Sequence, residues 1–175
     1  NGSGKTTLIK TLGTLLKPDR GLVRVGGLDT ARAGRAGRRS IGVVTHEPML
    51  YDQLTGHENL TFTARMFGLD DVEERVLDSA ERMGVTSRLH PRVAAMSHGL
   101  RKRFSIARAL LHDPLVLLLD EPESGLDQEA LGLLERVVAD YAGRSRTVLM
   151  TTHNLERGLS LGHRMAILSR GRIAY

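Results

Sequence analysis

The first residues of the chain form a glycine-rich run that is typical of a phosphate-binding loop leading into a helix. Residues 1–7 read NGSGKTT, the end of the pattern G-x-x-x-x-G-K-[ST], whose opening glycine would precede residue 1. Glycines let the backbone curl around an anion, so that the amides point inward at the positive end of the next helix. The expected nucleotide-binding residues of this run are Asn1, Gly2, Ser3, Gly4, Lys5, Thr6 and Thr7.

Two side chains of this run have a chemical role in the pattern. Lys5 can reach the terminal phosphates, and the Thr6 hydroxyl can ligate Mg²⁺. A flexible Gly/Ser loop before an ordinary helix would also fit these residues, so the rest of the chain has to decide. Because the motif begins part-way and the first residue is not Met, we expect the sequence to be truncated at its N-terminus.

The composition of the chain excludes several kinds of functional site and of protein. The 175 residues suffice for one compact domain, and the absence of cysteine excludes disulfides, a thiol nucleophile and a cysteine-based metal site. No apolar run reaches the roughly 18–20 residues of a membrane-spanning helix. The net charge is +5, and Arg32, Arg35, Arg38 and Arg39 cluster in one stretch. Because no aromatic residues are interleaved there for base stacking, we expect a solvated loop and no nucleic-acid partner.

Hydrophobic patterning predicts strands that alternate with helices, which indicates an α/β fold with a mostly parallel sheet and flanking helices. Residues 115–119 are continuously apolar, as in a strand covered on both faces. Residues 54–112 have a helical pattern, and we expect an inserted helical subdomain there. The expected strands are 22–25, 41–45, 115–119, 147–151 and 165–169. The expected helices are 6–17, 57–67, 72–83, 104–112, 131–141 and 154–161.

Two acids close the apolar strand at 115–119. Open α/β sheets bind ligands at the carboxyl ends of their strands, which is where Asp120 and Glu121 stand. Asp120 can hold the Mg²⁺ that bridges two phosphates, and Glu121 can act as the general base toward the attacking water. Solvated acids at an ordinary strand end are the alternative, but the pairing with Lys5 and Thr6 favours a nucleotide site.

A second anion cradle is predicted where a Ser-x-Gly turn opens a helix, at Ser97 and Gly99. A hydroxyl, free amides and the positive end of a helix combine there. A plain helix cap would look the same in isolation. The position of the turn before Asp120 is what favours the functional interpretation.

Five motifs in this order make the whole chain resemble the nucleotide-binding domain of an ABC (ATP-binding cassette) ATPase. Besides the phosphate loop, the Ser97 turn and the acids, they include Ser124-Gly125-Leu126-Asp127 and Thr151-Thr152-His153. The resemblance implies one domain with a P-loop NTPase fold, in which N-terminal strands are missing. Its core would comprise residues 1–50 and 113–175, and its helical subdomain would comprise residues 54–112.

The same resemblance implies that ATP and Mg²⁺ are bound between two cassettes, either a homodimer or paired cassettes, arranged head to tail. Ser97 and Gly99 would touch the γ-phosphate held by the partner, and Asp127 would support communication between the two sites. His153 would sense the γ-phosphate beside the catalytic Glu121.

Two departures from the family pattern stand out. His46 replaces the glutamine that ligates Mg²⁺ in the family, and one ring nitrogen of His46 could take over that role. In the family's signature, L-S-G-G-Q, His98 and Leu100 replace a glycine and the glutamine. His98 beside a tight phosphate cradle could weaken closure of the dimer.

The stretch from Val43 to Leu60 is similar to the haem-exporter ATPase subunit of cytochrome c maturation. The expected function is therefore an ATP-hydrolysing motor subunit, peripheral on the cytoplasmic face of the membrane, that energises export through a separate integral membrane subunit. Residues 51–54 and 57–67 would contact that subunit. The alternatives are a soluble ABC ATPase in DNA repair or translation, and a regulatory cassette that binds ATP without turnover.

Overall fold

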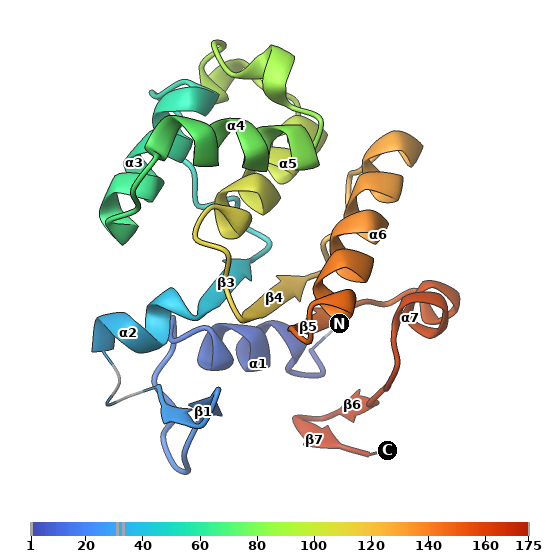
Figure 1. The fold of residues 1–175 in the computed structure, drawn as a ribbon. Helices are drawn as coiled ribbons and strands as arrows, with labels where there is room; N and C mark the ends of the chain where they lie inside the picture. Colours follow the sequence, from blue (N-terminus) through green and yellow to red (C-terminus); the bar gives the residue numbers. More distant parts are fainter. Residues whose placement is uncertain (1, 31, 33, 175) are drawn as a thin grey trace.

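A three-stranded parallel sheet lies at the centre of the computed structural model, which describes residues 2–30, 32 and 34–174 (Figure 1). The strand order is β3 (Ile41–Val44), β4 (Val116–Asp120) and β5 (Thr147–Thr151). In the register, Val44 is opposite Leu119, and Asp120 is opposite Thr151. The carboxyl ends of the three strands therefore lie at one edge of the sheet, as the alternation of strands and helices predicted.

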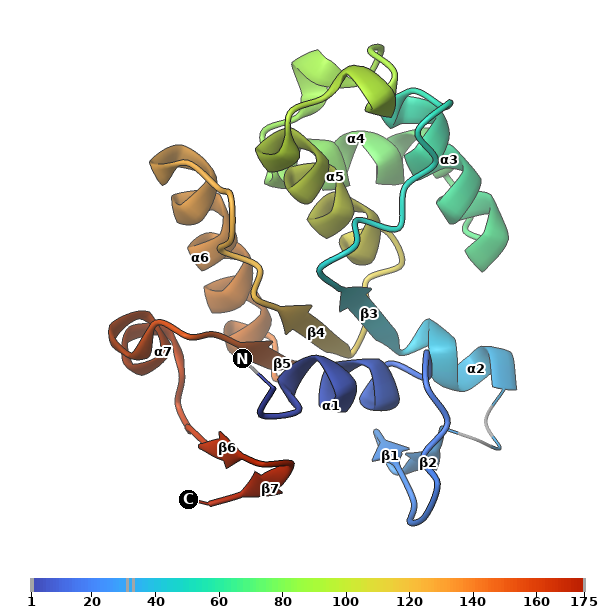
Figure 2. The same cartoon turned by 180° about the vertical axis from the view of Figure 1, so that it is seen from behind.

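Both faces of the sheet are covered, because successive side chains of β4 point to opposite sides. Leu118 packs with Ile9 of α1 (Lys5–Leu12) on one face. Leu117 and Leu119 join the larger core on the other face, together with residues of α5 (His98–Leu110) and α6 (Gln128–Gly143). Figure 2 shows α1 on one side of the strands and α3, α4, α5 and α6 on the other. The continuous apolar run of β4 is thus explained by burial on two sides.

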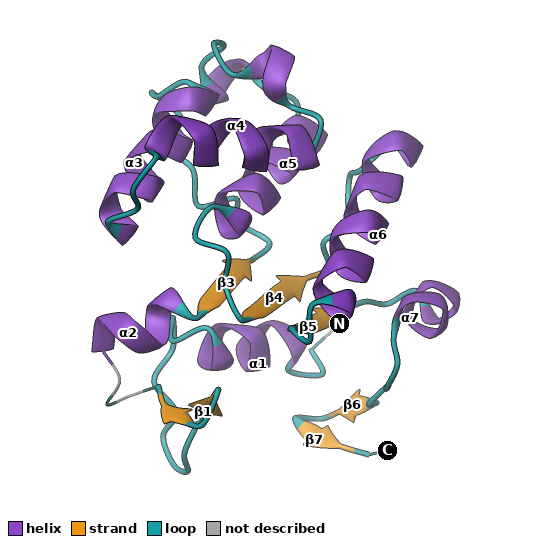
Figure 3. Cartoon of the chain, in the orientation of Figure 1, coloured by secondary structure: helices purple, strands orange, loops and turns teal. Residues whose placement is uncertain are grey.

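A layer of helices stands above the sheet, formed by α3 (Gly56–Phe67), α4 (Val72–Arg82) and α5, with two short 3₁₀ turns, η1 (Thr86–Arg88) and η2 (Val93–Ala95), between α4 and α5 (Figure 3). Thr55 begins α3 with a capping box, in which its side chain accepts from the Glu58 amide and the Glu58 carboxylate accepts from the Thr55 amide. One continuous apolar cluster joins this layer to the sheet. The division into a core and a helical subdomain at residues 54–112 stays a prediction.

Three of the expected helix assignments were wrong. The first helix ends at Leu12 and not at residue 17, because Gly13 is its C-cap and Thr14 leaves the helical conformation with a φ of 61°. The helix expected over residues 104–112 begins earlier, at His98, where the predicted Ser-x-Gly turn at Ser97 does cap it. The arginine-rich stretch expected as a loop contains α2 (Gly34–Arg39), in which arginine and alanine favour a helix.

The strands at the two ends of the sequence are shorter than expected. The stretch expected as a strand at 22–25 contributes only β1 (Arg24–Val25), which pairs antiparallel with β2 (Leu28–Asp29). Near the C-terminus, α7 (Leu155–Leu161) precedes a hairpin of β6 (Leu168–Ser169) and β7 (Arg172–Ile173). The expected strand at 165–169 is therefore part of a hairpin outside the parallel sheet. Among the described residues, no helix has the combination of length and hydrophobicity that crossing a bilayer requires.

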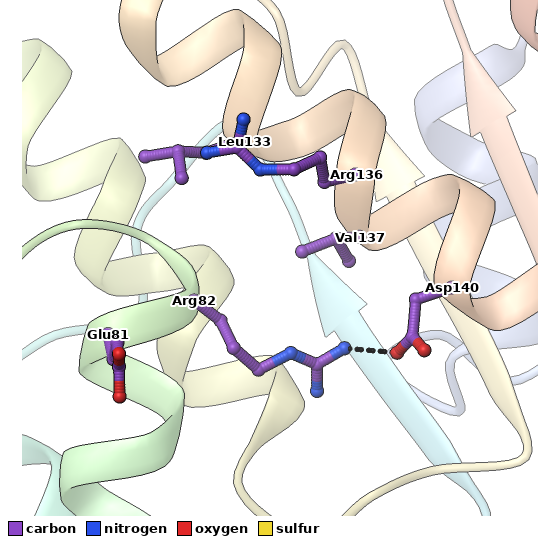
Figure 4. A pocket seen from close by; sticks show the side chains of 6 residues that line it. All are labelled: Glu81, Arg82, Leu133, Arg136, Val137 and Asp140. Atoms are coloured by element: carbon purple, nitrogen blue, oxygen red, sulfur yellow. Dashed lines mark hydrogen bonds and ion pairs between the residues drawn. The ribbon is translucent and has the colours of Figure 1, made fainter.

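A groove of about 250 Å³ separates α4 from α6, and one ion pair crosses it (Figure 4). Arg82 Nη2 on α4 lies 2.8 Å from Asp140 Oδ2 on α6. The same guanidinium lies over the ring of Tyr141, 5.9 Å from its centroid. Because the pair is partly shielded from water, it holds the helical layer against α6 more firmly than an exposed pair would.

His112 is a buried contact between the helical layer and the sheet. Its Nε2 is 3.1 Å from the carbonyl oxygen of Ile41, and its ring stacks on Phe67 with centroids 4.0 Å apart. Burial lowers the pKa of His112 from 6.5 to about 4, helped by the charges of Arg108 and Arg39. The imidazole is therefore neutral in the folded protein at pH 7.

We expect His112 to weaken the fold in mild acid. In the unfolded chain His112 is protonated below about pH 6.5, whereas in the folded protein it becomes protonated only near pH 4. Between these two values the unfolded state binds more protons, so the free energy of unfolding falls as the pH drops through that window. His112→Gln keeps an N–H donor for Ile41 but does not titrate. The variant should therefore lose about 2 kcal/mol less than wild type between pH 6.5 and 5 in urea unfolding. Parallel pH curves for the two proteins would contradict this assignment.

Candidate functional site

The phosphate loop forms one wall of a cavity of about 220 Å³. Gly2 and Gly4 have φ angles of 80° and 99°, in the left-handed region that favours glycine. Gly4 is the N-cap of α1, so the free amides of the first helical turn open into the loop. Asn1 lies outside the described residues. The described residues that line the cavity are Gly2, Ser3, Gly4, Lys5, Thr6, Thr7 and Glu121, which directly follows β4.

Asp120 is buried at the end of β4 and is fixed by the neighbouring strand. Thr151 Oγ1 donates a hydrogen bond to Asp120 Oδ1 at 2.7 Å. The amide of Glu121 in turn donates to the Thr151 carbonyl and hydroxyl oxygens, both at 3.1 Å. Glu121 has a φ of 44°, which is uncommon for a residue with a side chain. The chain therefore turns sharply after Asp120, and the turn brings Glu121 to the cavity.

The structure also brings His153 to Glu121, although the two are far apart in the sequence. His153 Nδ1 is 3.6 Å from Glu121 Oε1, and 70% of the histidine side chain is exposed. Both residues follow neighbouring parallel strands, β4 and β5. The family resemblance implies that these two residues lie close together, and the roles of His153 and Glu121 toward a nucleotide stay a prediction.

Sequence reasoning missed two side chains that support this edge. Thr151 binds Asp120, as described above, and the Thr152 hydroxyl donates a short hydrogen bond to Glu123 Oε1. The second bond connects the segment after Glu121 to the segment that carries His153. A threonine has no distinctive signal in one sequence, and only the pairing of β4 with β5 reveals these contacts.

The turn at Ser97 caps α5 and packs against the segment after Glu121. Ser97 Oγ accepts a hydrogen bond from the Leu100 amide at 3.3 Å. A Cβ on Gly99 would come 2.6 Å from the Gly125 carbonyl oxygen, and a Cβ on Gly125 would come 2.5 Å from the His98 ring. His98 thus covers Gly125, which explains how the imidazole fits where the family has a glycine. Ser97 and Gly99 are not among the described residues that line the phosphate-loop cavity.

Asp127 and His46 are the remaining two predicted site residues. Asp127 is the N-cap of α6, where its side chain accepts from the Ala130 amide at 2.8 Å. His46 is exposed in the loop after β3, which ends at the same sheet edge as β4. No hydrogen bond among the described residues joins His46 to Thr6 or Asp120, so its role toward a metal stays a prediction.

The cavity fits a magnesium nucleotide by its chemistry. The curled amides of the phosphate loop and the Lys5 ammonium suit the oxygens of a polyphosphate. Thr6 lines the cavity and offers a hydroxyl, one of the hard oxygen ligands that Mg²⁺ prefers. Asp120 is buried at the end of β4 and is not among the described residues that line the cavity, so its carboxylate as a second ligand stays a prediction. Glu121 adds a carboxylate to the lining, and the His153 imidazole, which is not among the described residues that line the cavity, lies 3.6 Å from that carboxylate.

Comparison with known proteins shows which family this chain belongs to. The family model described as "ABC transporter" matches residues 1–124. The chain belongs to the ABC transporter family. Its ABC cassette is 33% identical to the ABC transporter ATP-binding protein NatA of Bacillus subtilis (strain 168), over 178 residues that cover all of this chain and 72% of NatA. As a member of this family the cassette is an ATPase, and its fold is the expected P-loop α/β fold.

Two further matches agree with this assignment. The ABC cassette is 36% identical to the Nod factor export ATP-binding protein I of Paraburkholderia xenovorans (strain LB400), over 98% of this chain and 57% of that protein. A solved ATP-binding subunit of an ABC transporter superposes with a TM-score of 0.92 at 29% identity, over all of this chain and 74% of that one. The chain therefore spans between about half and three quarters of the length of these relatives.

Proposed function

We propose that the complete protein hydrolyses MgATP and thereby drives export through a separate membrane subunit. The observation that supports this most directly is the cavity shared by the phosphate loop and Glu121, with His153 3.6 Å from Glu121. The name of the Nod factor relative supports export as the direction of transport. The similarity of residues 43–60 to haem-exporter subunits supports haem as one candidate cargo.

Each site residue has a distinct proposed role. Lys5 binds the terminal phosphates as a point charge, and Thr6 and Asp120 would hold Mg²⁺, which neutralises phosphate charge when bound. Glu121 accepts the proton of the attacking water as a general base. His153 donates or accepts a hydrogen bond beside Glu121 and so orients the water and the γ-phosphate.

The second phosphate cradle is proposed to act on a neighbouring cassette. Ser97 and Gly99 open the helix α5, but they do not line the phosphate-loop cavity of their own chain, among the described residues. A head-to-tail arrangement of two cassettes would place Ser97 and Gly99 of one against the nucleotide of the other. Asp127, close in sequence to Glu121, would then lie near the contact between the two sites.

The proposed surface for the membrane subunit is the docking patch, an exposed apolar group that comprises Met49, Tyr51, Phe62 and Met66. The rings of Tyr51 and Phe62 meet edge to face, with centroids 5.3 Å apart. The buried Asn59 fixes the loop to α3, because its side chain accepts from the Tyr51 amide at 2.7 Å and donates to the Tyr51 carbonyl at 3.0 Å. A rigid, exposed aromatic pair of this kind is typical of a contact surface.

The docking patch gives the test of the proposed coupling. Tyr51→Glu and Phe62→Glu in the complete protein should each lower co-purification with the membrane protein encoded beside it by at least about tenfold, because a charge would be buried at the contact. MgATP affinity should stay within about twofold, because neither residue lines the cavity. Leu155→Glu is the control, since Leu155 is also exposed but lies on α7. Full co-purification of both docking variants would contradict the proposed surface.

A further inference from the structure

Lys102 is a buried lysine to which the nucleotide site assigns no role so far. Only 3% of the residue is exposed, and it stands on α5, one turn after the Ser97 cradle. Its Nζ donates to the carbonyl oxygen of Thr45 at 3.4 Å and to that of Asp120 at 3.3 Å. The ammonium therefore lies between the ends of β3 and β4, beneath the edge of the sheet that carries the site.

The surroundings of Lys102 explain why an ammonium is tolerated there. Burial lowers the pKa of Lys102, and the negative charges of Asp120, Glu123 and Glu121 oppose that shift. A buried cation without such partners would cost several kcal/mol, and an apolar side chain of similar volume would avoid that cost. The lysine is thus matched to carbonyl and carboxylate oxygens that belong to the functional edge.

The two carbonyls that Lys102 binds precede two site residues. The Thr45 carbonyl belongs to the peptide unit that leads into His46, and the Asp120 carbonyl belongs to the unit that leads into Glu121. The Glu121 peptide is also bound on its amide side by Thr151, so Lys102 and β5 hold it from opposite ends. The Glu121 side chain is attached to the residue that directly follows this peptide unit, and the backbone turns sharply there, at a φ of 44°. A small rotation of the peptide unit would therefore move the Glu121 carboxylate.

We propose that Lys102 is a positioning residue, which fastens the peptide units before His46 and Glu121 to α5 and so couples the Ser97 cradle to the hydrolytic edge. This inference rests on the proposed function for its catalytic consequence. The fastening itself is a property of the fold and is measurable without turnover. Movement of α5, when Ser97 meets a nucleotide on a neighbouring cassette, would be passed through Lys102 to both strand ends.

Two variants of Lys102 in the complete protein separate its hydrogen bonds from its bulk. Lys102→Met keeps the volume but has no donor, whereas Lys102→Gln keeps an N–H donor on a shorter side chain. Lys17→Met is the matched control, because Lys17 is exposed in the turn after α1. The two readouts are amide hydrogen exchange of the segments 41–48 and 116–124, and steady-state ATP hydrolysis analysed as kcat and KM.

For Lys102→Met we expect exchange in those two segments to rise at least about tenfold, and kcat to fall about tenfold with KM nearly unchanged. Lys102→Gln should lie between Lys102→Met and wild type in both readouts, and Lys17→Met should match wild type. Wild-type exchange and kcat in Lys102→Met would overturn the proposal. If Lys102→Met does not fold, wild-type values in Lys102→Gln would overturn it instead.

Two further outcomes are decisive. A uniform rise in exchange along the whole chain, with a matching loss of melting temperature, would assign Lys102 a merely structural role and overturn the proposal. If wild type does not hydrolyse ATP, the proposed function fails, but the exchange of segments 41–48 and 116–124 still decides whether Lys102 fastens them.

Discussion

Glu121→Gln is expected to lower the kcat for ATP hydrolysis by at least about a hundredfold in the complete protein, while MgATP still binds. The amide has nearly the shape of the carboxylate, so the turn after Asp120 and the contact with Thr151 should persist. What the amide cannot do is accept the proton of the attacking water. Phosphate release at saturating ATP measures the loss, and calorimetric titration with MgATP measures the retained affinity.

Glu129→Gln is the matched control for this experiment. Glu129 lies on the first turn of α6, and 76% of its side chain is exposed. Its substitution should leave kcat within about twofold of wild type, because surface charges away from a site have small effects. Wild-type turnover of Glu121→Gln would remove Glu121 from the role of general base. A loss of MgATP binding in that variant would instead assign Glu121 to nucleotide binding.

Phe104→Ala is expected to destabilise the fold by about 3–5 kcal/mol, which is the usual cost of emptying a buried aromatic site. Phe104 is fully buried on α5. Its ring lies directly against the first residue of α3, so that a Cβ on Gly56 would come 2.4 Å from Phe104 Cζ. The ring therefore sets how α3 and α5 pack. Urea unfolding of wild type and variant, followed by circular dichroism, measures the difference.

Phe62→Ala serves as the comparison, because Phe62 is 40% exposed on the outer face of α3. That variant should lose less than about 2 kcal/mol, since 40% of Phe62 is already exposed and its truncation leaves no enclosed cavity. Equal losses for the two phenylalanines would show that the packing of α3 on α5 does not depend on Phe104.

The parts of the fold that the sequence predicts well are those where local pattern and burial agree. The apolar run of β4 is buried on both faces, and the acids that follow it do stand at the carboxyl edge of a parallel sheet. Glu121 and the phosphate loop line one cavity, although they are far apart in the sequence. Strands that alternate with helices favour a parallel sheet, which is why the fold class was predictable although the strand order was not.

The parts that the sequence did not predict depend on contacts between distant segments. Gly13 packs on Val43 and caps the end of α1, whereas the periodicity of leucines continues past that point. In the sequence, Lys102 is one of several basic residues of a helix. Only the structure shows that its ammonium binds the carbonyls at the ends of β3 and β4. His98 reads as a defect of the signature, yet its ring has a defined place over Gly125.

The proposed binding site for a polyphosphate and its metal lies between the phosphate loop and the acids of β4. Calorimetric titration of the complete protein with MgATP, in wild type and in Lys5→Met, measures binding at this site. We expect saturable binding by wild type and an affinity at least about tenfold weaker in Lys5→Met, because a charge-assisted contact to phosphate is lost. No binding by wild type, or equal affinity of the two proteins, would contradict the proposed site.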